Sequence, residues 1–290
     1  MSTASRHIGC LIGMGRVFLV ATDLDGSLLS HEDYGYDEAK PVIELLEQLR
    51  IPLVFVSSKT RPEILALRAE TGNGHPFVVE NGSAVYLPRG YFDFEPEGCE
   101  PVGDFLRRTF SPPRDHWAPV LQRLRQQMPG EFRDFSNAGV AGIVEMTGLE
   151  LEQAAMANER EFSEPVKWLG NDSNLEGFVA TVRSEGGCVY RGGRFFTIAG
   201  ETSKGIAYRW LREQYAIANE GAPVSDLCVG DGANDVPMLE LSKDALLIPN
   251  EGRSLPQLER TEAVWVGEGI GPAAWASGVS DWLHRLYQPG

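Results

Sequence analysis

The chain has 290 residues, of which 42% are hydrophobic and 23% charged, so it can bury one large core or two of ordinary size. It has 26 lysines and arginines against 41 aspartates and glutamates, which gives a net charge of -15 at pH 7. This charge argues against nucleic acid or an anionic membrane as partner, because both attract basic surfaces. The sequence contains no apolar run of about 18 residues, so no transmembrane helix is predicted.

The N-terminal residues and the cysteines point to no chemistry of their own. Residues 1–15 precede the first apolar strand and are predicted to form a poorly ordered leader, and translation can begin at Met1 or at Met14. No cysteine belongs to a Cys-x-x-Cys pair. We therefore predict a cytoplasmic protein with reduced thiols at Cys10, Cys99, Cys188 and Cys228.

The first third of the chain alternates short apolar runs with amphipathic segments. Residues 16–22 (RVFLVAT) and 51–56 (IPLVFV) are rich in β-branched and aromatic side chains, which is typical of buried strands. Helical spacing of apolar residues predicts helices over 38–50 and 61–71, and residues 77–79 are predicted as a third strand. This order predicts a parallel sheet with helices on its faces.

The middle of the chain lacks this alternation. Residues 86–100 carry proline, glycine and aromatic residues without a helical period. We predict an α+β unit with an antiparallel sheet, in which Gly192-Gly193 forms a hairpin turn. Its expected helices cover 117–128 and 151–164, and its expected strands cover 142–145, 178–182, 188–191 and 194–198.

The alternation of strands and helices resumes near residue 203. Together with the first third, this predicts the α/β fold class: a Rossmann-like parallel-sheet core with an inserted α+β domain. The expected helices cover 203–215, 236–241 and 273–286, and the expected strands cover 226–229, 245–248 and 262–266.

Acidic loops follow two of the predicted buried strands. Asp23 and Asp25 come directly after residues 16–22, and GDGAND after residues 226–229 supplies Asp231, Asn234 and Asp235. Ligand sites of open α/β sheets lie beyond the carboxyl ends of the strands. Neighbouring carboxylates repel one another, and a divalent cation that takes oxygen ligands, such as Mg²⁺, relieves that repulsion. One acidic turn is an ordinary surface feature, but two such loops favour a metal-dependent site.

Two further segments offer groups that bind phosphate. Ser57, Ser58, Lys59 and Arg61 follow the predicted strand 51–56, and Lys204 stands at the start of the predicted helix 203–215. Hydroxyls, cations and backbone amides at a helix start bind phosphate oxygens. The ordinary alternatives are a helix N-cap for SSKTR and a surface lysine for Lys204. The G-x-x-x-x-G-K spacing of a P-loop is absent.

Taken in order, these segments resemble the motifs of the haloacid dehalogenase superfamily of phosphohydrolases: D-x-D-G, a strand-end serine, a lysine and G-D-G-x-N-D. The long insertion between the second and third motifs resembles the α+β cap of that superfamily's sugar phosphatases. The resemblance implies a catalytic core formed by residues 16–87 and 200–290, and a cap formed by 88–199 that selects the substrate.

The segments SSKTR, FVVENGSAVYLP, EFSEPV, RGGRFFTIAG and SKG resemble, more narrowly, the mannosyl-3-phosphoglycerate phosphatase family. Two departures are Ser27, where threonine is usual, and TSKG, which lacks an acidic residue before Lys204. This resemblance implies Mg²⁺-dependent hydrolysis of mannosyl-3-phosphoglycerate, or its glucosyl analogue, to phosphate and a glycosylglycerate, a compatible solute. It leaves open the sugar, the preferred metal and the oligomeric state.

The resemblance also implies roles for individual residues. Asp23 is the nucleophile that forms an aspartyl-phosphate, and Asp25 is the general acid and then the general base. Mg²⁺ is held by Asp23, Asp231 and the backbone carbonyl of Asp25, while Asn234 and Asp235 complete or orient its shell. The residues implied for phosphate and substrate are Lys204, either Ser57 or Ser58, Lys59, Arg61, Glu80 and Asn81.

Three alternatives stay open at this point. The chain could act on another sugar phosphate, such as sucrose or trehalose phosphate. A phosphomutase would transfer the phosphate to a second sugar oxygen instead of to water. A non-catalytic binding protein on the same fold is the third, although such a protein has no need for the pair Asp23 and Asp25.

Overall fold

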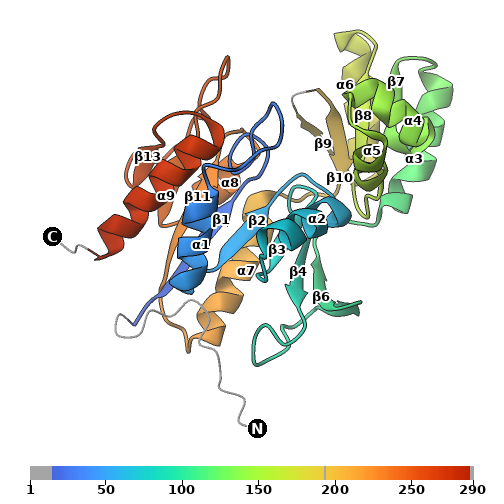
Figure 1. Cartoon of the computed structure of the whole chain (residues 1–290). Coiled ribbons are helices and arrows are strands. Elements are labelled where there is room, and N and C mark those ends of the chain that lie inside the picture. Colours follow the sequence, from blue (N-terminus) through green and yellow to red (C-terminus); the bar gives the residue numbers. More distant parts are fainter. Residues whose placement is uncertain (1–14, 193, 288–290) are drawn as a thin grey trace.

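The computed structural model describes residues 15–192 and 194–287, which form a nine-stranded sheet and a separate four-stranded sheet (Figure 1). Apart from Gly15, the predicted leader lies outside the described residues, and so does Cys10. No helix of the described part is long and apolar enough to cross a membrane.

The nine-stranded sheet has β1 near its centre, between β11 and β2. Neighbouring strands from β13 to β3 run parallel, whereas β4, β6 and β5 extend the sheet by antiparallel pairing. In sheet order the strands are β13 (Val264–Val266), β12 (Asp244–Leu247), β11 (Val224–Gly230), β1 (Val17–Thr22), β2 (Leu53–Val56), β3 (Phe77–Val79), β4 (Ala84–Pro88), β6 (Phe105–Thr109) and β5 (Glu100–Val102).

Helices cover both faces of this sheet, because its strands alternate their side chains between two apolar clusters. In β1, Phe18 and Val20 pack on one side, while Leu19 and Ala21 pack on the other. Helices α1 (Lys40–Gln48), α2 (Arg61–Thr71) and α9 (Gly271–Tyr287) contribute to the first cluster, and α7 (Lys204–Ala218) and α8 (Val236–Leu239) to the second.

The four-stranded antiparallel sheet forms a second body, at the upper right of Figure 1. Its apolar cluster joins β8, β10, α3 and α6 around the buried Trp117 and Phe178. The strands in sheet order are β7 (Phe132–Asp134), β8 (Glu164–Trp168), β10 (Phe196–Ala199) and β9 (Cys188–Arg191). The helices are η1 (Arg114–Trp117), α3 (Ala118–Gln127), α4 (Phe135–Thr147), α5 (Leu151–Asn158) and α6 (Asp172–Ser184).

The predicted α/β core with an inserted α+β unit is confirmed, but two predicted strands are wrong. Residues 142–145 lie in α4 and residues 178–182 in α6. The predicted helix 151–164 is too long: α5 ends at Asn158, and Glu164 belongs to β8. Strands β4 to β8 were not predicted, and the predicted Gly192-Gly193 turn includes Gly193, which lies outside the described residues.

The predicted boundary between core and cap at residue 88 does not coincide with the end of the nine-stranded sheet. Strands β5 and β6 pair with the nine-stranded sheet, so this sheet continues as far as Thr109. The division of the chain into a catalytic core and a substrate-selecting cap stays a prediction. Among the described cysteines, Cys99, Cys188 and Cys228 are free thiols.

Candidate active site

The central strand β1 places Asp23 at the carboxyl edge of the sheet. The backbone N–H of Asp23 still donates to the carbonyl of Val229 on β11, at 2.9 Å. Its own carbonyl accepts from Thr22 Oγ1 at 2.7 Å, and that hydroxyl accepts from Trp275 Nε1 at 2.9 Å. The Asp23 residue is only 6% exposed. These bonds fix the main chain from which the Asp23 carboxyl group projects.

The neighbouring strand β11 ends in the second acidic loop. Asp235, at the start of α8, accepts through Oδ2 from the backbone N–H of Asp231 at 3.1 Å and of Gly232 at 2.9 Å. Asp235 is fully buried. It therefore fixes the shape of the loop that carries Asp231.

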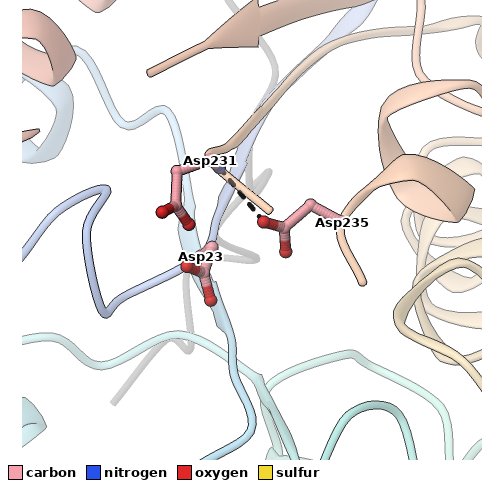
Figure 2. A group of neighbouring side chains, drawn as sticks. All are labelled: Asp23, Asp231 and Asp235. Atoms are coloured by element: carbon pink, nitrogen blue, oxygen red, sulfur yellow. Dashed lines mark hydrogen bonds between the residues drawn. The ribbon is translucent and has the colours of Figure 1, made fainter. Parts of the chain in front are cut away.

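Because β1 and β11 are adjacent and parallel, their terminal loops meet at one edge of the sheet. One carboxylate oxygen from each of Asp23, Asp231 and Asp235 lies within 4.8 Å of the others. Figure 2 shows the three carboxyl groups around a common space, with the bond from the Asp231 backbone to Asp235 dashed. The sequence motifs anticipated this cluster from two segments about 200 residues apart.

Lys204 lies between two of these carboxylates. As the first residue of α7 it is fully buried, and its Nζ donates to Asp23 Oδ1 at 2.5 Å and to Asp235 Oδ1 at 2.6 Å. Burial by itself would lower the pKa of Lys204, but the two carboxylates outweigh it and raise the pKa above its ordinary value. Lys204 is therefore a charged ammonium inside the site and not a surface lysine.

The carboxylates repel one another despite this lysine. Burial, followed by repulsion from Asp235 and Asp231, raises the pKa of Asp23 well above its usual range against the opposing effect of Lys204. Burial and Asp235 likewise raise the pKa of Asp231. Three carboxylates around one ammonium leave an excess of negative charge that a divalent cation would offset. An all-oxygen donor set suits a hard cation such as Mg²⁺.

Asp25, two residues after Asp23, is paired with a different lysine. Its Oδ1 is 2.9 Å from Lys59 Nζ, and the side chains of Asp25 and Lys59 are 30% and 15% exposed. Lys59 also lies 3.8 Å from Glu63 Oε1 and over the ring of Tyr34. Burial would lower the pKa of Lys59, but Asp25 and Glu63 raise it overall. The predicted substrate ligand Lys59 is thus placed against Asp25.

The strand β2 carries the serine motif to the same edge, on the other side of β1. Ser57 directly follows β2 and is fully buried, and its Oγ accepts from the backbone N–H of Lys59 at 3.2 Å. Ser58 is half-buried, and its carbonyl accepts from Arg160 Nη2 at 2.8 Å. Arg61 is directed to Glu161 Oε1, with its Nε at 2.8 Å. Arg61 is therefore engaged with the second body.

The structure differs from the prediction most clearly at Glu80. The residue is 1% exposed, and its carboxylate accepts from Glu161 N at 2.7 Å and from Ser163 N and Oγ at 2.8 Å and 2.5 Å. A weaker bond comes from Phe162 N at 3.3 Å, and Arg160 Nε lies 3.5 Å away. Both oxygens are occupied, so the predicted substrate contact is corrected to a role in holding residues 160–163.

The rest of the turn that contains Glu80 packs against the other motifs. Asn81 Oδ1 accepts from Asn234 Nδ2 at 3.1 Å, which joins this turn to the loop after β11. Gly82 has φ +96°, and a Cβ there would lie 2.0 Å from the carbonyl oxygen of Ser203. Only glycine permits this approach to the segment that carries Lys204.

Three residues near the acidic cluster were missed by the sequence reasoning. Asn250 follows β12 and donates through Nδ2 to Asp231 Oδ2 at 3.0 Å, and His31 Nε2 lies 3.2 Å from the same oxygen. Arg253 Nη1 lies 3.7 Å from it. The signal for Asn250 was its place shortly after β12, another buried strand of the parallel part of the sheet. His31 and Arg253 stand in loops and carried no such signal.

Comparisons with solved structures give the class of fold. Its fold matches a haloalkanoate dehalogenase superfamily phosphatase from Bacteroides thetaiotaomicron with a TM-score of 0.63 at 16% identity, over 95% of this chain and 97% of that one. It matches the sucrose-phosphatase of Synechocystis with a TM-score of 0.60 at 13% identity, over 92% and 98%. The chain therefore has the fold of these phosphatases of the haloacid dehalogenase superfamily.

Sequence comparisons identify the family to which the chain belongs. The chain is 33% identical over 269 residues to a glucosyl-3-phosphoglycerate/mannosyl-3-phosphoglycerate phosphatase of Methanococcoides burtonii, covering 92% of this chain and 97% of that one. It is 32% identical over 254 residues to a protein of the same name from Persephonella marina, covering 84% and 91%. No family model matches. The chain belongs to the glucosyl-3-phosphoglycerate/mannosyl-3-phosphoglycerate phosphatase family.

Proposed function

We propose that the chain hydrolyses glucosyl-3-phosphoglycerate and mannosyl-3-phosphoglycerate to the glycosylglycerate and phosphate. The observation that carries this proposal is the buried Asp23, held by Lys204 at the carboxyl edge of the sheet, in a chain whose relatives bear that name over nearly their whole length. A phosphatase of this type needs one carboxylate to attack phosphorus and a second to move protons.

In the first half of the reaction, Asp23 attacks phosphorus with a carboxylate oxygen. A bond from that oxygen to phosphorus forms while the bond from phosphorus to the glycerate oxygen breaks, and Asp25 gives its proton to the departing alkoxide. In the second half, Asp25 takes a proton from water, and the hydroxide attacks phosphorus. The bond between phosphorus and Asp23 then breaks, which releases phosphate and restores the carboxylate. Asp25 suits this role because it is only two residues from Asp23 and its side chain is partly exposed.

Mg²⁺ is the proposed cofactor, held by carboxylate oxygens of Asp23 and Asp231 and by the backbone carbonyl of Asp25. When bound, it offsets negative charge on the phosphoryl oxygens and on the carboxylates. We assign Asp235 to orientation rather than coordination, because its oxygens already accept from Lys204 and from two backbone amides. Asn234 acts at the edge of this shell through its bond to Asn81.

Phosphate oxygens are proposed to bind Lys204 and the serine loop. Lys204 Nζ already lies against Asp23, so an oxygen of the attacked phosphoryl group would meet it directly. Ser57 is the better placed of the two serines, because it directly follows β2, next to β1. Lys59 can contribute a cation to the leaving group near Asp25. The cap would close over the sugar and exclude water.

We place this activity in the cytoplasm. A glycosyl phosphoglycerate carries a phosphate and a carboxylate, and such an anion does not cross a bilayer unaided. The enzyme that consumes it therefore works where the substrate is made. The free thiols of Cys99, Cys188 and Cys228 are compatible with that compartment.

A substrate panel tests the proposal. Phosphate release with Mg²⁺ is measured for mannosyl- and glucosyl-3-phosphoglycerate, sucrose phosphate, trehalose phosphate and 3-phosphoglycerate, with Asp23→Asn as control. We expect the highest kcat/KM for the two glycosyl phosphoglycerates and no release by the variant. Equal activity across the panel would reject the substrate and retain the chemistry. A phosphorylated sugar isomer in place of free phosphate would indicate a phosphomutase.

A further inference from the structure

The loop after β12 contributes an amide that joins both acidic loops of the site. Asn250 Nδ2 donates to the carbonyl oxygen of Gly26 at 2.8 Å and to Asp231 Oδ2 at 3.0 Å. Gly26 follows Asp25 directly in the first acidic loop, and Asp231 heads the second. One side chain therefore fixes the distance between the two loops.

The Asn250 amide also sets the orientation of the Asp231 carboxylate. Its Oδ2 accepts from Asn250 and is contacted by His31, whereas Oδ1 accepts from no donor in residues 15–192 or 194–287. A carboxylate with one oxygen held by an outer partner presents the other to a cation with little rotational freedom. Asn250 is suited to this task because an NH₂ group has two donors and no charge.

The atoms around Gly26 are closely packed where the two acidic loops meet. Gly26 has φ +87°, and a Cβ there would lie 2.1 Å from His31 Nε2 and 2.7 Å from Asp231 Oδ2. Its N–H donates to the carbonyl of Leu29 at 2.7 Å, so this turn is fixed from within. The Gly26 carbonyl that accepts from Asn250 therefore belongs to a rigid turn. Because the Asn250 amide is bonded to this turn, it holds Asp231 Oδ2 in a fixed position.

We propose that Asn250 is a positioning residue for the metal site, which sets the orientation of Asp231 and its spacing from the Asp23–Gly26 loop. This inference rests on the proposed metal-dependent function. Asn250 touches neither substrate nor metal in this scheme. It acts through Asp231, as outer partners of metal ligands do elsewhere, where their loss weakens metal affinity by roughly 10- to 100-fold.

The experiment is a calorimetric titration of Mg²⁺ into the substrate-free enzyme, for wild type and for Asn250→Ala and Asn250→Leu. The leucine variant preserves most of the volume and removes both donors. Glu251→Ala is the matched control, because Glu251 is the exposed next residue in the same loop. We expect the Kd for Mg²⁺ to rise about 10-fold or more in both Asn250 variants and to be unchanged in the control. At saturating Mg²⁺, kcat should recover to within about threefold of wild type.

A purely structural role gives a different result. It would lower Tm in the presence of a chelator and leave the Kd for Mg²⁺ unchanged in the folded variants, which would overturn the proposal. Should both variants unfold, Asn250→Gln serves instead, since it keeps the amide but displaces it, and an unchanged Kd there would also overturn the proposal. A wild-type enzyme that binds Mg²⁺ and lacks phosphatase activity would reject the proposed function alone. A wild type without Mg²⁺ binding would reject both.

Discussion

Replacing Glu80 by glutamine is predicted to loosen the junction between the two bodies of the molecule. The carboxylate accepts three short hydrogen bonds from residues 161–163, and all of these donors belong to buried or half-buried residues. Glutamine keeps one oxygen but points an NH₂ group at donors for which residues 15–192 and 194–287 provide no other acceptor. It also removes the negative charge beside Arg160, whose side chain is 8% exposed.

The size of this effect follows from the contacts. A hydrogen bond to a charged group contributes about 1.5–3 kcal/mol, and a buried donor left without an acceptor costs about 1–3 kcal/mol. Losing one to two of the three bonds should therefore lower the free energy of unfolding by about 2–4 kcal/mol. At roughly 2 °C per kcal/mol for a chain of this size, Tm would fall by about 4–8 °C.

The assay combines thermal unfolding with amide hydrogen exchange at residues 161–163. Glu97→Gln is the matched control, because Glu97 is an exposed glutamate of the nine-stranded body. In Glu80→Gln the three amides should exchange faster, and KM should rise because Arg160 also holds the carbonyl of Ser58 in the serine loop. A Tm within about 1 °C of wild type, with unchanged exchange, would refute the reasoning.

Three further outcomes are expected at single residues. Asp23→Asn should lower kcat on the order of 10³-fold or more while the protein stays folded, and residual activity within tenfold of wild type would exclude Asp23 as nucleophile. Lys204→Met removes the cation between Asp23 and Asp235. Urea unfolding at pH 7 in the presence of a chelator should therefore show a free energy of unfolding that is lower by about 3–5 kcal/mol. A variant as stable as wild type, or more stable, would contradict this structural role of Lys204. Burial lowers the pKa of His75 from 6.5, so the unfolded chain binds its proton first as the pH falls. The free energy of unfolding should therefore decrease as the pH drops below about 6.5. His75→Gln should make it less dependent on pH between about pH 7.5 and 5.5. Identical slopes of the free energy of unfolding against pH in wild type and variant would exclude His75 as the cause.

The sequence predicted the core strands and most of the acidic cluster because both depend on local patterns. The runs 17–21 and 51–56 are apolar at every position, as expected for strands covered on both faces, and the structure places them near the centre of the sheet. Parallel strands bring their carboxyl ends to one edge, so Asp23, Ser57 and Asp231 could be placed together before any coordinates were known.

Local patterns failed where short apolar runs fit two kinds of element. Residues 178–182 (FVATV) contain β-branched side chains that favour a strand, yet Phe178 and Val182 are four residues apart and pack on one face of α6. In residues 142–145, Ile143 likewise packs with Met146 on one face of α4. These segments are helical because their apolar faces pack into clusters formed with distant parts of the chain. A window of five residues contains no information about such clusters.

The residue types of the site were determined by the sequence, but their partners were decided only by tertiary structure. A glutamate after β3 looks like a polar substrate contact until its carboxylate is found among the amides of residues 161–163, some 80 positions away. Lys204 could have been a surface side chain until α7 placed it between Asp23 and Asp235. Asn250 became visible only when the loop after β12 came within reach of Gly26 and Asp231. A hydrogen bond depends on distances in space, and the sheet order that sets those distances is a property of the whole chain.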